Sequence, residues 1–214
     1  MDHKLASIRS EYSLRDLSGD SVNDSPFAEF RKWLDEAILA RVFEPTAMTL
    51  ATVGSNGSPS ARIILLKDVS EKGLTFFTNY ESRKGKQLDE NPKAALVFYW
   101  PELERQVRFE GEVDKLTGSE SDEYFSSRPE GSKAGAWASR QSNIISSRKA
   151  LESEVHKITA HFGNKSIPRP PYWGGYILAP VLAEFWQGRP DRLNDRIQYI
   201  LNEENKWEIA RLSP

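Results

Sequence analysis

The spacing of apolar residues changes several times along the chain. Residues 1–25 are polar and show no sustained periodicity, so we expect them to form a mobile N-terminal arm. From Pro26 apolar side chains recur at helical spacing, behind Ser25 as the N-terminal cap. The pattern therefore predicts an amphipathic helix that packs on a core. Its repeating apolar positions are Phe27, Phe30, Trp33, Leu34, Ile38 and Val42.

From Thr49 onward the period shortens to two. TLATV, ARIILLKDV and LTFFTN, separated by glycine-containing turns, predict β-strands, as do AALVFYW and ERQVRFEGEVDKL. A short helix, SRKGKQLDENP, interrupts them and ends before Pro92. Helical patterns follow, and the C-terminal third returns to strands with a polar turn at Asn202 to Asn205. Consecutive strands favour a mainly β (α+β) fold, an antiparallel sheet or barrel with peripheral helices, over a doubly wound sheet.

Composition narrows the class of protein. A length of 214 residues with 38% hydrophobic and 28% charged residues predicts one globular domain, which we expect to span residues 26–214. The chain has no apolar run of membrane-spanning length and no secretory signal pattern, so we expect a cytoplasmic protein without membrane contact. Its net charge of -2 gives no general attraction to nucleic acid. Without cysteine, and with three scattered histidines, we expect no metal site.

Two segments have the residue types of anion sites. Ser82, Arg83 and Lys84 begin a helix directly after a strand, so a hydroxyl, two cations and free backbone N–H groups converge there. Tyr124 and Arg128 share one face of a predicted helix, and Ser132 just beyond it can complete a phosphate clamp. Taken singly, each segment also fits an ordinary solvated surface.

Two further groups of cations have no single interpretation from the residues alone. Arg62 and Lys67 bracket an apolar strand, where they could bind an anion or simply solubilise the strand ends. EFWQGRPDRLNDR places Arg189, Arg192 and Arg196 near two aromatic residues, a cluster that suits either an anion or a solvated turn. The chain has no GxGxxG or GxxxxGK[ST] loop and no GxSxG elbow, which disfavours those nucleotide sites and a serine hydrolase.

Seven segments in order resemble the pyridoxamine 5'-phosphate oxidase family. They are RIILLK, FTNYESRKGKQLDENP, LERQVRFEG, YFSSRPEGSKAGAWASRQS, YWGG, EFWQGRPDRLNDR and ARLSP, and IRSEY is similar to the family's lid. The resemblance implies an FMN-binding split β-barrel that works as a homodimer with active sites at the subunit interface. It also implies FMN-dependent oxidation of pyridoxamine or pyridoxine 5'-phosphate to pyridoxal 5'-phosphate, with hydride passing to the flavin and dioxygen reduced to hydrogen peroxide.

The resemblance also implies roles for individual residues. The FMN contacts would be Arg62, Ile63, Ile64, Leu65, Phe77, Thr78, Arg83, Lys84, Gln106, Gln141, Ser142, Trp186 and Arg196. The substrate contacts would be Lys67, Tyr124, Arg128 and Ser132 at the phosphate, Arg192 and Asn194 as the catalytic pair at the ring, and Arg9 and Tyr12 closing over it.

One position departs from the family's usual pattern. The family reads RLHDR where this chain reads RLNDR, so Asn194 replaces a histidine. Asparagine cannot carry a proton near neutral pH, so we expect lower turnover, which Asn194→His should raise. The alternatives are a non-catalytic or weakly active flavin or pyridoxal-phosphate binding protein on the same fold, or another split-barrel flavin oxidoreductase. The second phosphate clamp argues against both.

Overall fold

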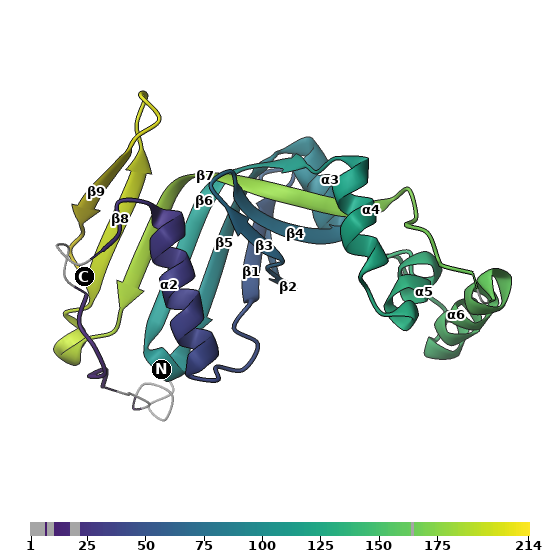
Figure 1. Ribbon diagram of the computed structural model, residues 1–214, viewed down its shortest axis with the longest axis horizontal. Coiled ribbons are helices and arrows are strands. Elements are labelled where there is room, and N and C mark those ends of the chain that lie inside the picture. Colours follow the sequence, from purple (N-terminus) through teal and green to yellow (C-terminus); the bar gives the residue numbers. More distant parts are fainter. Residues whose placement is uncertain (1–6, 8–10, 18–21, 164) are drawn as a thin grey trace. The chain divides into compact units, whose positions relative to one another are not determined.

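A large antiparallel sheet organises the chain (Figure 1). The computed structural model describes residues 7, 11–17, 22–163 and 165–214. Among them the strand order is β2-β1-β5-β6-β7-β4-β3, and β8 pairs with both β7 and β9. The strands are β1 Ala47–Val53, β2 Pro59–Leu65, β3 Asp68–Ser70, β4 Gly73–Asn79, β5 Lys93–Trp100, β6 Arg105–Lys115, β7 Trp173–Gln187, β8 Asp195–Leu201 and β9 Trp207–Arg211. The predicted α+β class with an antiparallel sheet is confirmed.

Five α-helices accompany the sheet in the described residues. They are α2 Pro26–Leu39, α3 Arg83–Glu90, α4 Gly118–Ser126, α5 Glu130–Ala138 and α6 Arg148–Phe162. The chain divides into two compact units: the first comprises residues 1–50, 95–111 and 180–214, and the second residues 51–94 and 112–179. No helix of the described residues has the length and apolar character to cross a membrane.

The first unit has an aromatic core beneath α2. This helix begins as predicted, with the Ser25 hydroxyl accepting a hydrogen bond from the Ala28 N–H. It lies along β5 and β6 (Figure 1), and the Phe30 ring is 4.8 Å from Phe98 between ring centres. Ile38, which the sequence pattern placed on the buried face, is exposed, whereas Ala37 is buried. The buried face continues Phe30 and Trp33 to Ala37, and each helical step turns the next side chain by about 100°.

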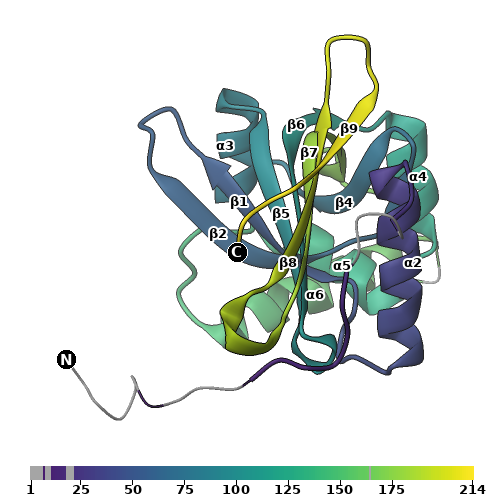
Figure 2. The ribbon, with the colours of Figure 1, turned by 90° about the vertical axis from the view of Figure 1, so that its left-hand side faces the viewer.

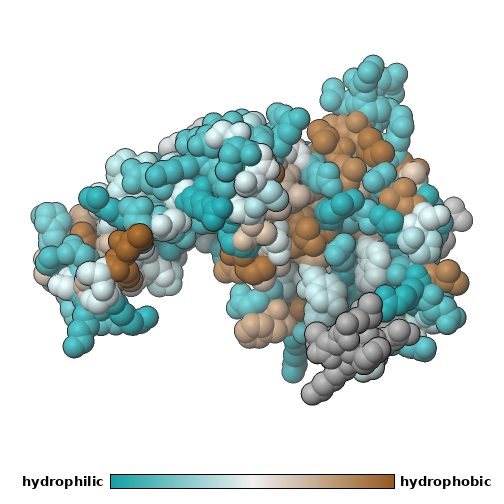
Figure 3. All heavy atoms as spheres, turned by 180° about the vertical axis from the view of Figure 1, so that it is seen from behind, coloured by the Kyte–Doolittle hydropathy of each residue, from teal (hydrophilic) through white to brown (hydrophobic). Residues whose placement is uncertain are grey.

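The same unit ends in the β8–β9 hairpin (Figure 2). The predicted polar turn is present: Asn202 Oδ1 accepts hydrogen bonds from the N–H groups of Glu204 and Lys206. Apolar atoms gather on one face of this unit (Figure 3), and Val181, Ile200 and Ile209 of its strands are exposed. Contiguous apolar surface of this kind is typical of a contact face.

The second unit places small residues where side chains must pack against β7. In the pairing of β4 with β7, Phe77 lies opposite Gly175 and Thr78 opposite Gly174. A Cβ at Gly174 would collide with the Tyr80 hydroxyl, and one at Gly175 would collide with the Phe77 ring. The two glycines therefore act as close-packing residues and let Phe77 lie against the strand.

Local capping fixes the helices of the second unit. Ser82 caps α3 by accepting a hydrogen bond from the Gly85 N–H, and α3 ends at Glu90, two residues before Pro92. Thr117 and Glu120 form a reciprocal capping box at the start of α4. Further along, α5 and α6 lie side by side (Figure 1).

Candidate ligand-binding site

The second unit contains a pocket of about 800 Å³. Strands β2 and β4, the first turn of α3, α4 and the residues around Gln141 contribute to its walls. The pocket brings together many residues singled out from the sequence: Arg62, Ile63, Ile64, Leu65, Lys67, Phe77, Thr78, Arg83, Lys84, Tyr124, Arg128, Ser132, Gln141 and Ser142. Residues far apart in sequence, Arg62 and Ser142 among them, therefore line one cavity.

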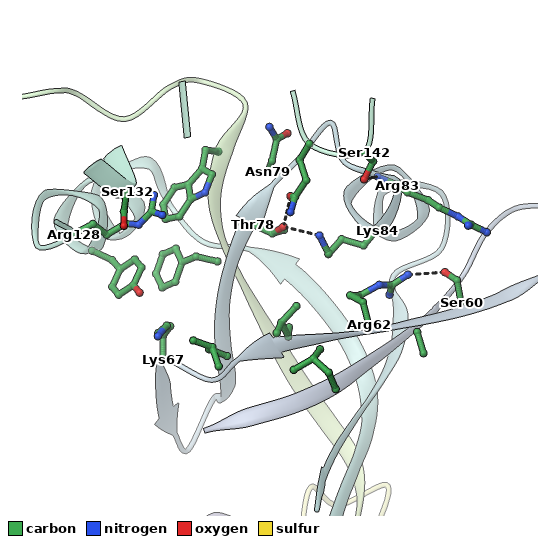
Figure 4. Close-up of a pocket in the computed structure, with 18 of the residues that line it drawn as sticks. Ser60, Arg62, Lys67, Thr78, Asn79, Arg83, Lys84, Arg128, Ser132 and Ser142 are labelled. Carbon is green, nitrogen blue, oxygen red and sulfur yellow. Dashed lines mark hydrogen bonds between the residues drawn. The ribbon is translucent and has the colours of Figure 1, made fainter. Parts of the chain in front are cut away.

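One side of the pocket is built around Arg62 (Figure 4). Its Nη1 donates to Thr52 Oγ1 at 2.7 Å and its Nη2 to Ser60 Oγ at 2.6 Å. Gln87 Oε1 accepts from the same two hydroxyls, each at 2.7 Å. This network comes from β1, β2 and α3, and it fixes the direction of the guanidinium. Burial lowers the pKa of Arg62, with the neighbouring charge of Arg83 acting in the same direction.

Lys84 lies on the same side and is 8% exposed. Its ammonium donates to Thr78 Oγ1 at 3.2 Å, and that hydroxyl donates to Gln141 Oε1 at 3.2 Å. Burial, followed by repulsion from Arg62, lowers the pKa of Lys84 to about 8. The Arg83 N–H donates to Ser142 Oγ at 3.2 Å, which ties the start of α3 to the loop after α5. We call Arg62, Arg83 and Lys84 the first cation group.

A second cation group, Lys67 and Arg128, lies across the pocket with Ser132 (Figure 4). The Arg128 guanidinium carbon is 4.6 Å from the centre of the Trp173 ring. Its Nη1 is buried without a hydrogen-bond partner among the described residues, and burial lowers the pKa of Arg128. A buried, unsatisfied guanidinium nitrogen is costly, so this group is suited to accept an anion.

Stacked rings form the floor beside the second group. Phe77 and Tyr124 stack with ring centres 3.9 Å apart, and Trp173 stacks on Phe77 at 5.5 Å. Tyr124 and Arg128 both line the pocket, but they do not share one helix as predicted, because α4 ends at Ser126 and Arg128 follows it. Stacked aromatic faces of this kind offer a surface for a planar ligand.

The charge of the pocket is strongly one-sided. Its lining contains five cationic side chains and, among the described residues, no carboxylate. Within the part of the chain that the structure describes, Lys67, Arg83, Lys84 and Arg128 have no ion pair with a carboxylate. Uncompensated cations under partial burial favour an anionic ligand.

The remaining predicted site residues belong to the first unit: Gln106, Trp186, Arg192, Asn194, Arg196 and Tyr12. Arg196 is occupied by protein acceptors, since Nε and Nη2 donate to the two Glu184 carboxylate oxygens at 3.0 Å each and Nη1 to the Ser213 carbonyl at 2.9 Å. Arg192 is exposed, and Tyr12 lies edge-on to Trp186 at 5.7 Å between ring centres. Arg9 lies outside the described residues.

Sequence reasoning missed the residues that support the pocket. Thr52 and Gln87, which hold Arg62, are 35 positions apart. Gln87 lies in the segment FTNYESRKGKQLDENP, but neither residue was identified as part of a site. Trp173 was recognised only as part of YWGG, yet it packs against Arg128. No local signal identifies such supporting residues, because their role follows from long-range contacts.

The antiparallel sheet and its pocket define the class as a split β-barrel protein with a cationic pocket, and comparisons with known proteins agree. A family model described as pyridoxamine 5'-phosphate oxidase matches residues 34–162, and one described as the pyridoxine 5'-phosphate oxidase C-terminal dimerisation region matches residues 173–214. The chain belongs to the pyridoxamine 5'-phosphate oxidase family.

Individual relatives support this membership over the full length. A pyridoxine/pyridoxamine 5'-phosphate oxidase of Nostoc sp. is 53% identical over 100% of both chains. The protein of the same description from Burkholderia thailandensis is 56% identical over 98% of this chain and 99% of its own. The crystal structure of PhzG from Burkholderia lata, in complex with tetrahydrophenazine-1-carboxylic acid, matches with a TM-score of 0.88 and 34% identity over 94% of this chain and 100% of that chain.

Proposed function

We propose that this protein oxidises pyridoxamine 5'-phosphate or pyridoxine 5'-phosphate to pyridoxal 5'-phosphate with FMN as cofactor and dioxygen as electron acceptor. The observation that carries the proposal is that one pocket holds both cation groups and has no carboxylate among its described lining residues. FMN and the vitamer each carry one phosphate monoester, so a site for both needs two cationic groups. The full-length similarity to proteins described as this oxidase supports the same activity.

The first cation group fits the FMN phosphate. Arg62 is held in a fixed direction by two hydroxyls, and the pKa of Lys84 is lowered by burial, so both side chains gain from a bound dianion. The proposed FMN contacts in the second unit are Arg62, Ile63, Ile64, Leu65, Phe77, Thr78, Arg83, Lys84, Gln141 and Ser142. When bound, FMN supplies the two-electron redox chemistry.

The second cation group fits the substrate phosphate. The buried Arg128 Nη1 lacks a partner among the described residues, and Lys67 and Ser132 line the same wall. With Tyr124 these side chains would fix the phosphate end of the vitamer and so orient its C4' carbon. For the amine, the balanced reaction converts the C4' methylene amine, dioxygen and water to the aldehyde, ammonia and hydrogen peroxide. For the alcohol, dioxygen alone is consumed and hydrogen peroxide is released.

We propose that the site is completed in a homodimer. Trp186, Arg192, Asn194 and Arg196 fall within the segment that matches a dimerisation region. With Gln106, these are the other residues that the family resemblance assigns to flavin and substrate, and Tyr12 and Arg9 would cover the substrate. The apolar face of the first unit provides surface for such an association (Figure 3).

Anaerobic flavin reduction tests the activity. Protein reconstituted with FMN is mixed with pyridoxamine 5'-phosphate without oxygen, and the flavin absorbance is followed before air is admitted. Bleaching followed by recovery with peroxide is the expected result. A flavin that stays oxidised while the vitamer is bound would instead favour the alternative, a binding protein on the same fold.

Asn194→His provides a second measurement on the same assay. General acid-base assistance is worth about 100- to 10,000-fold where it operates, so a histidine at this position should raise kcat if proton transfer limits the rate. An unchanged or lower kcat would reject a limiting role for the missing imidazole.

A further inference from the structure

The turn that carries Arg192 has an unusual backbone. Asp191 and Arg192 are consecutive residues in the left-handed region, with φ values of 57° and 62°. The Leu193 N–H donates to the Pro190 carbonyl at 3.1 Å and closes the turn η3, Pro190–Arg192. Side chains with a Cβ rarely adopt this region, and two in succession persist only where surrounding contacts hold them.

Asn194 supplies one of those contacts. Its side-chain Oδ1 accepts a hydrogen bond from the Arg189 N–H at 3.0 Å, which joins the two ends of the turn. Asn194 is partly buried, whereas the Arg192 side chain is exposed. The carboxamide oxygen is therefore engaged with backbone, and Arg192 stands at the apex of the loop that this bond closes.

A second set of contacts anchors the base of the turn. The Arg189 guanidinium lies 3.5 Å from Asp195 Oδ2 and donates to the Arg15 carbonyl at 3.1 Å. Asp195 Oδ1 accepts from Arg211 at 2.6 Å. The Arg189–Asp195 ion pair joins the side chains at the base of the turn, and the Asn194 carboxamide holds the backbone N–H of Arg189 within it.

We propose that Asn194 is a positioning residue: by accepting the Arg189 N–H it holds the left-handed Asp191–Arg192 pair and so presents the Arg192 guanidinium in one direction. The inference rests on the proposed function, in which Arg192 packs against the pyridine ring of the vitamer. Asn194 then serves the reaction through backbone geometry, because an amide oxygen accepts a hydrogen bond at any pH at which the protein is folded.

Three variants separate this role from others. Asn194→Ala removes the acceptor, and Asn194→Asp keeps an oxygen at the same position. Asn202→Ala is the matched control, since Asn202 also accepts two backbone N–H groups in a tight turn of the same unit and lies outside the proposed site. Each variant is compared with the wild type as FMN-loaded full-length protein.

Limited trypsin digestion measures how firmly the turn is held, and it does not depend on enzyme activity. Trypsin cleaves after arginine but not before proline, so the Arg192–Leu193 bond is cleavable and the Arg189–Pro190 bond is not. We expect Asn194→Ala to be cut at Arg192 about tenfold faster than the wild type, with Asn194→Asp and Asn202→Ala near the wild-type rate. Equal cleavage of Asn194→Ala and the wild type would overturn the proposal.

The affinity of the protein for pyridoxal 5'-phosphate reports on the position of the Arg192 guanidinium. Binding is followed by absorbance. The Kd should rise about tenfold in Asn194→Ala, because a displaced Arg192 guanidinium binds the vitamer less well. It should return to the wild-type value in Asn194→Asp and stay unchanged in Asn202→Ala. FMN affinity should not change in any of them. A faster digestion with an unchanged Kd would reject the positioning role. If the wild type has no oxidase activity, the proposed function is rejected but the positioning role of Asn194 is not, because neither digestion nor binding requires turnover.

Discussion

Arg108 and Arg196 of the first unit differ from Arg128 of the second unit in how their charge is compensated. In the first unit, Arg108 and Arg196 share the Glu184 carboxylate, which is 4% exposed. In the second unit, Arg128 lies in a pocket whose described lining has no carboxylate. One buried nitrogen of Arg128 and one of Arg108 lack a hydrogen-bond partner, so the carboxylate is what separates the two sites. Pairing raises the pKa of Arg196, whereas burial lowers the pKa of Arg128. The difference is one of charge compensation: Arg108 and Arg196 have a carboxylate partner within the protein, whereas Arg128 has none among the described residues.

The largest effect is expected from the second cation group. Arg128→Met removes charge-assisted hydrogen bonds to the substrate phosphate, each worth about 1.5–3 kcal/mol, so kcat/KM should fall on the order of 100-fold. Steady-state kinetics with pyridoxamine 5'-phosphate measures it, and Arg148→Met on exposed α6 is the control. A kcat/KM within threefold of the wild type would show that Arg128 does not hold the phosphate.

Lys84→Met should weaken FMN binding by about 30-fold, because one charge-assisted contact to the phosphate is lost. The free protein should be no less stable, since a buried cation with repulsive neighbours is removed. Flavin fluorescence titration and thermal unfolding give the two values. Lys86→Met, at an exposed position of the same helix, should change neither. A marked loss of stability in Lys84→Met would contradict this expectation, because Lys84 would then stabilise the fold as the paired arginines of the first unit do.

Glu184→Gln should have the opposite effect on stability. The variant leaves two guanidinium groups without their shared carboxylate, and we expect unfolding to become easier by about 1–2 kcal/mol. The loss stays below that of a fully buried pair because both arginines are partly exposed. Denaturant unfolding measures it. Glu110→Gln, at an exposed partner of Arg108, should cost less than about 0.5 kcal/mol, and equal losses would refute a special role for Glu184.

The smallest effect concerns pH. The pKa of Lys84 is about 8 in the folded protein without ligand, below its ordinary 10.5. Between these values the unfolded chain binds the extra proton, so the free wild type gains stability relative to Lys84→Met as pH rises from 8 to 10.5. FMN affinity should fall about fivefold from pH 7 to pH 9 as the ammonium loses its charge. Titrations at both pH values test this, and an equal fall in Lys84→Met would assign the dependence to another group.

Local features of the fold followed from the sequence. The helical spacing behind Ser25 located α2, and alternation in ERQVRFEGEVDKL located β6 with Val107 and Phe109 buried. The cap at Ser82 and the turn at Asn202 could also be predicted from the sequence, because each depends on a few neighbouring residues. The prediction was wrong at Ile38, because the apolar spacing identifies a buried helix face but not where that face ends.

By itself, the sequence determined the types of elements and the supply of cations for two anionic groups. Only the tertiary structure decided how each cation is used: Arg196 meets Glu184 12 positions away and Arg108 meets it 76 positions away. Arg62 meets Thr52 and Ser60, and Arg128 meets the Trp173 ring. Periodicity and capping are local properties of the chain, whereas the partner of a charged side chain is chosen by strand register and packing between distant segments.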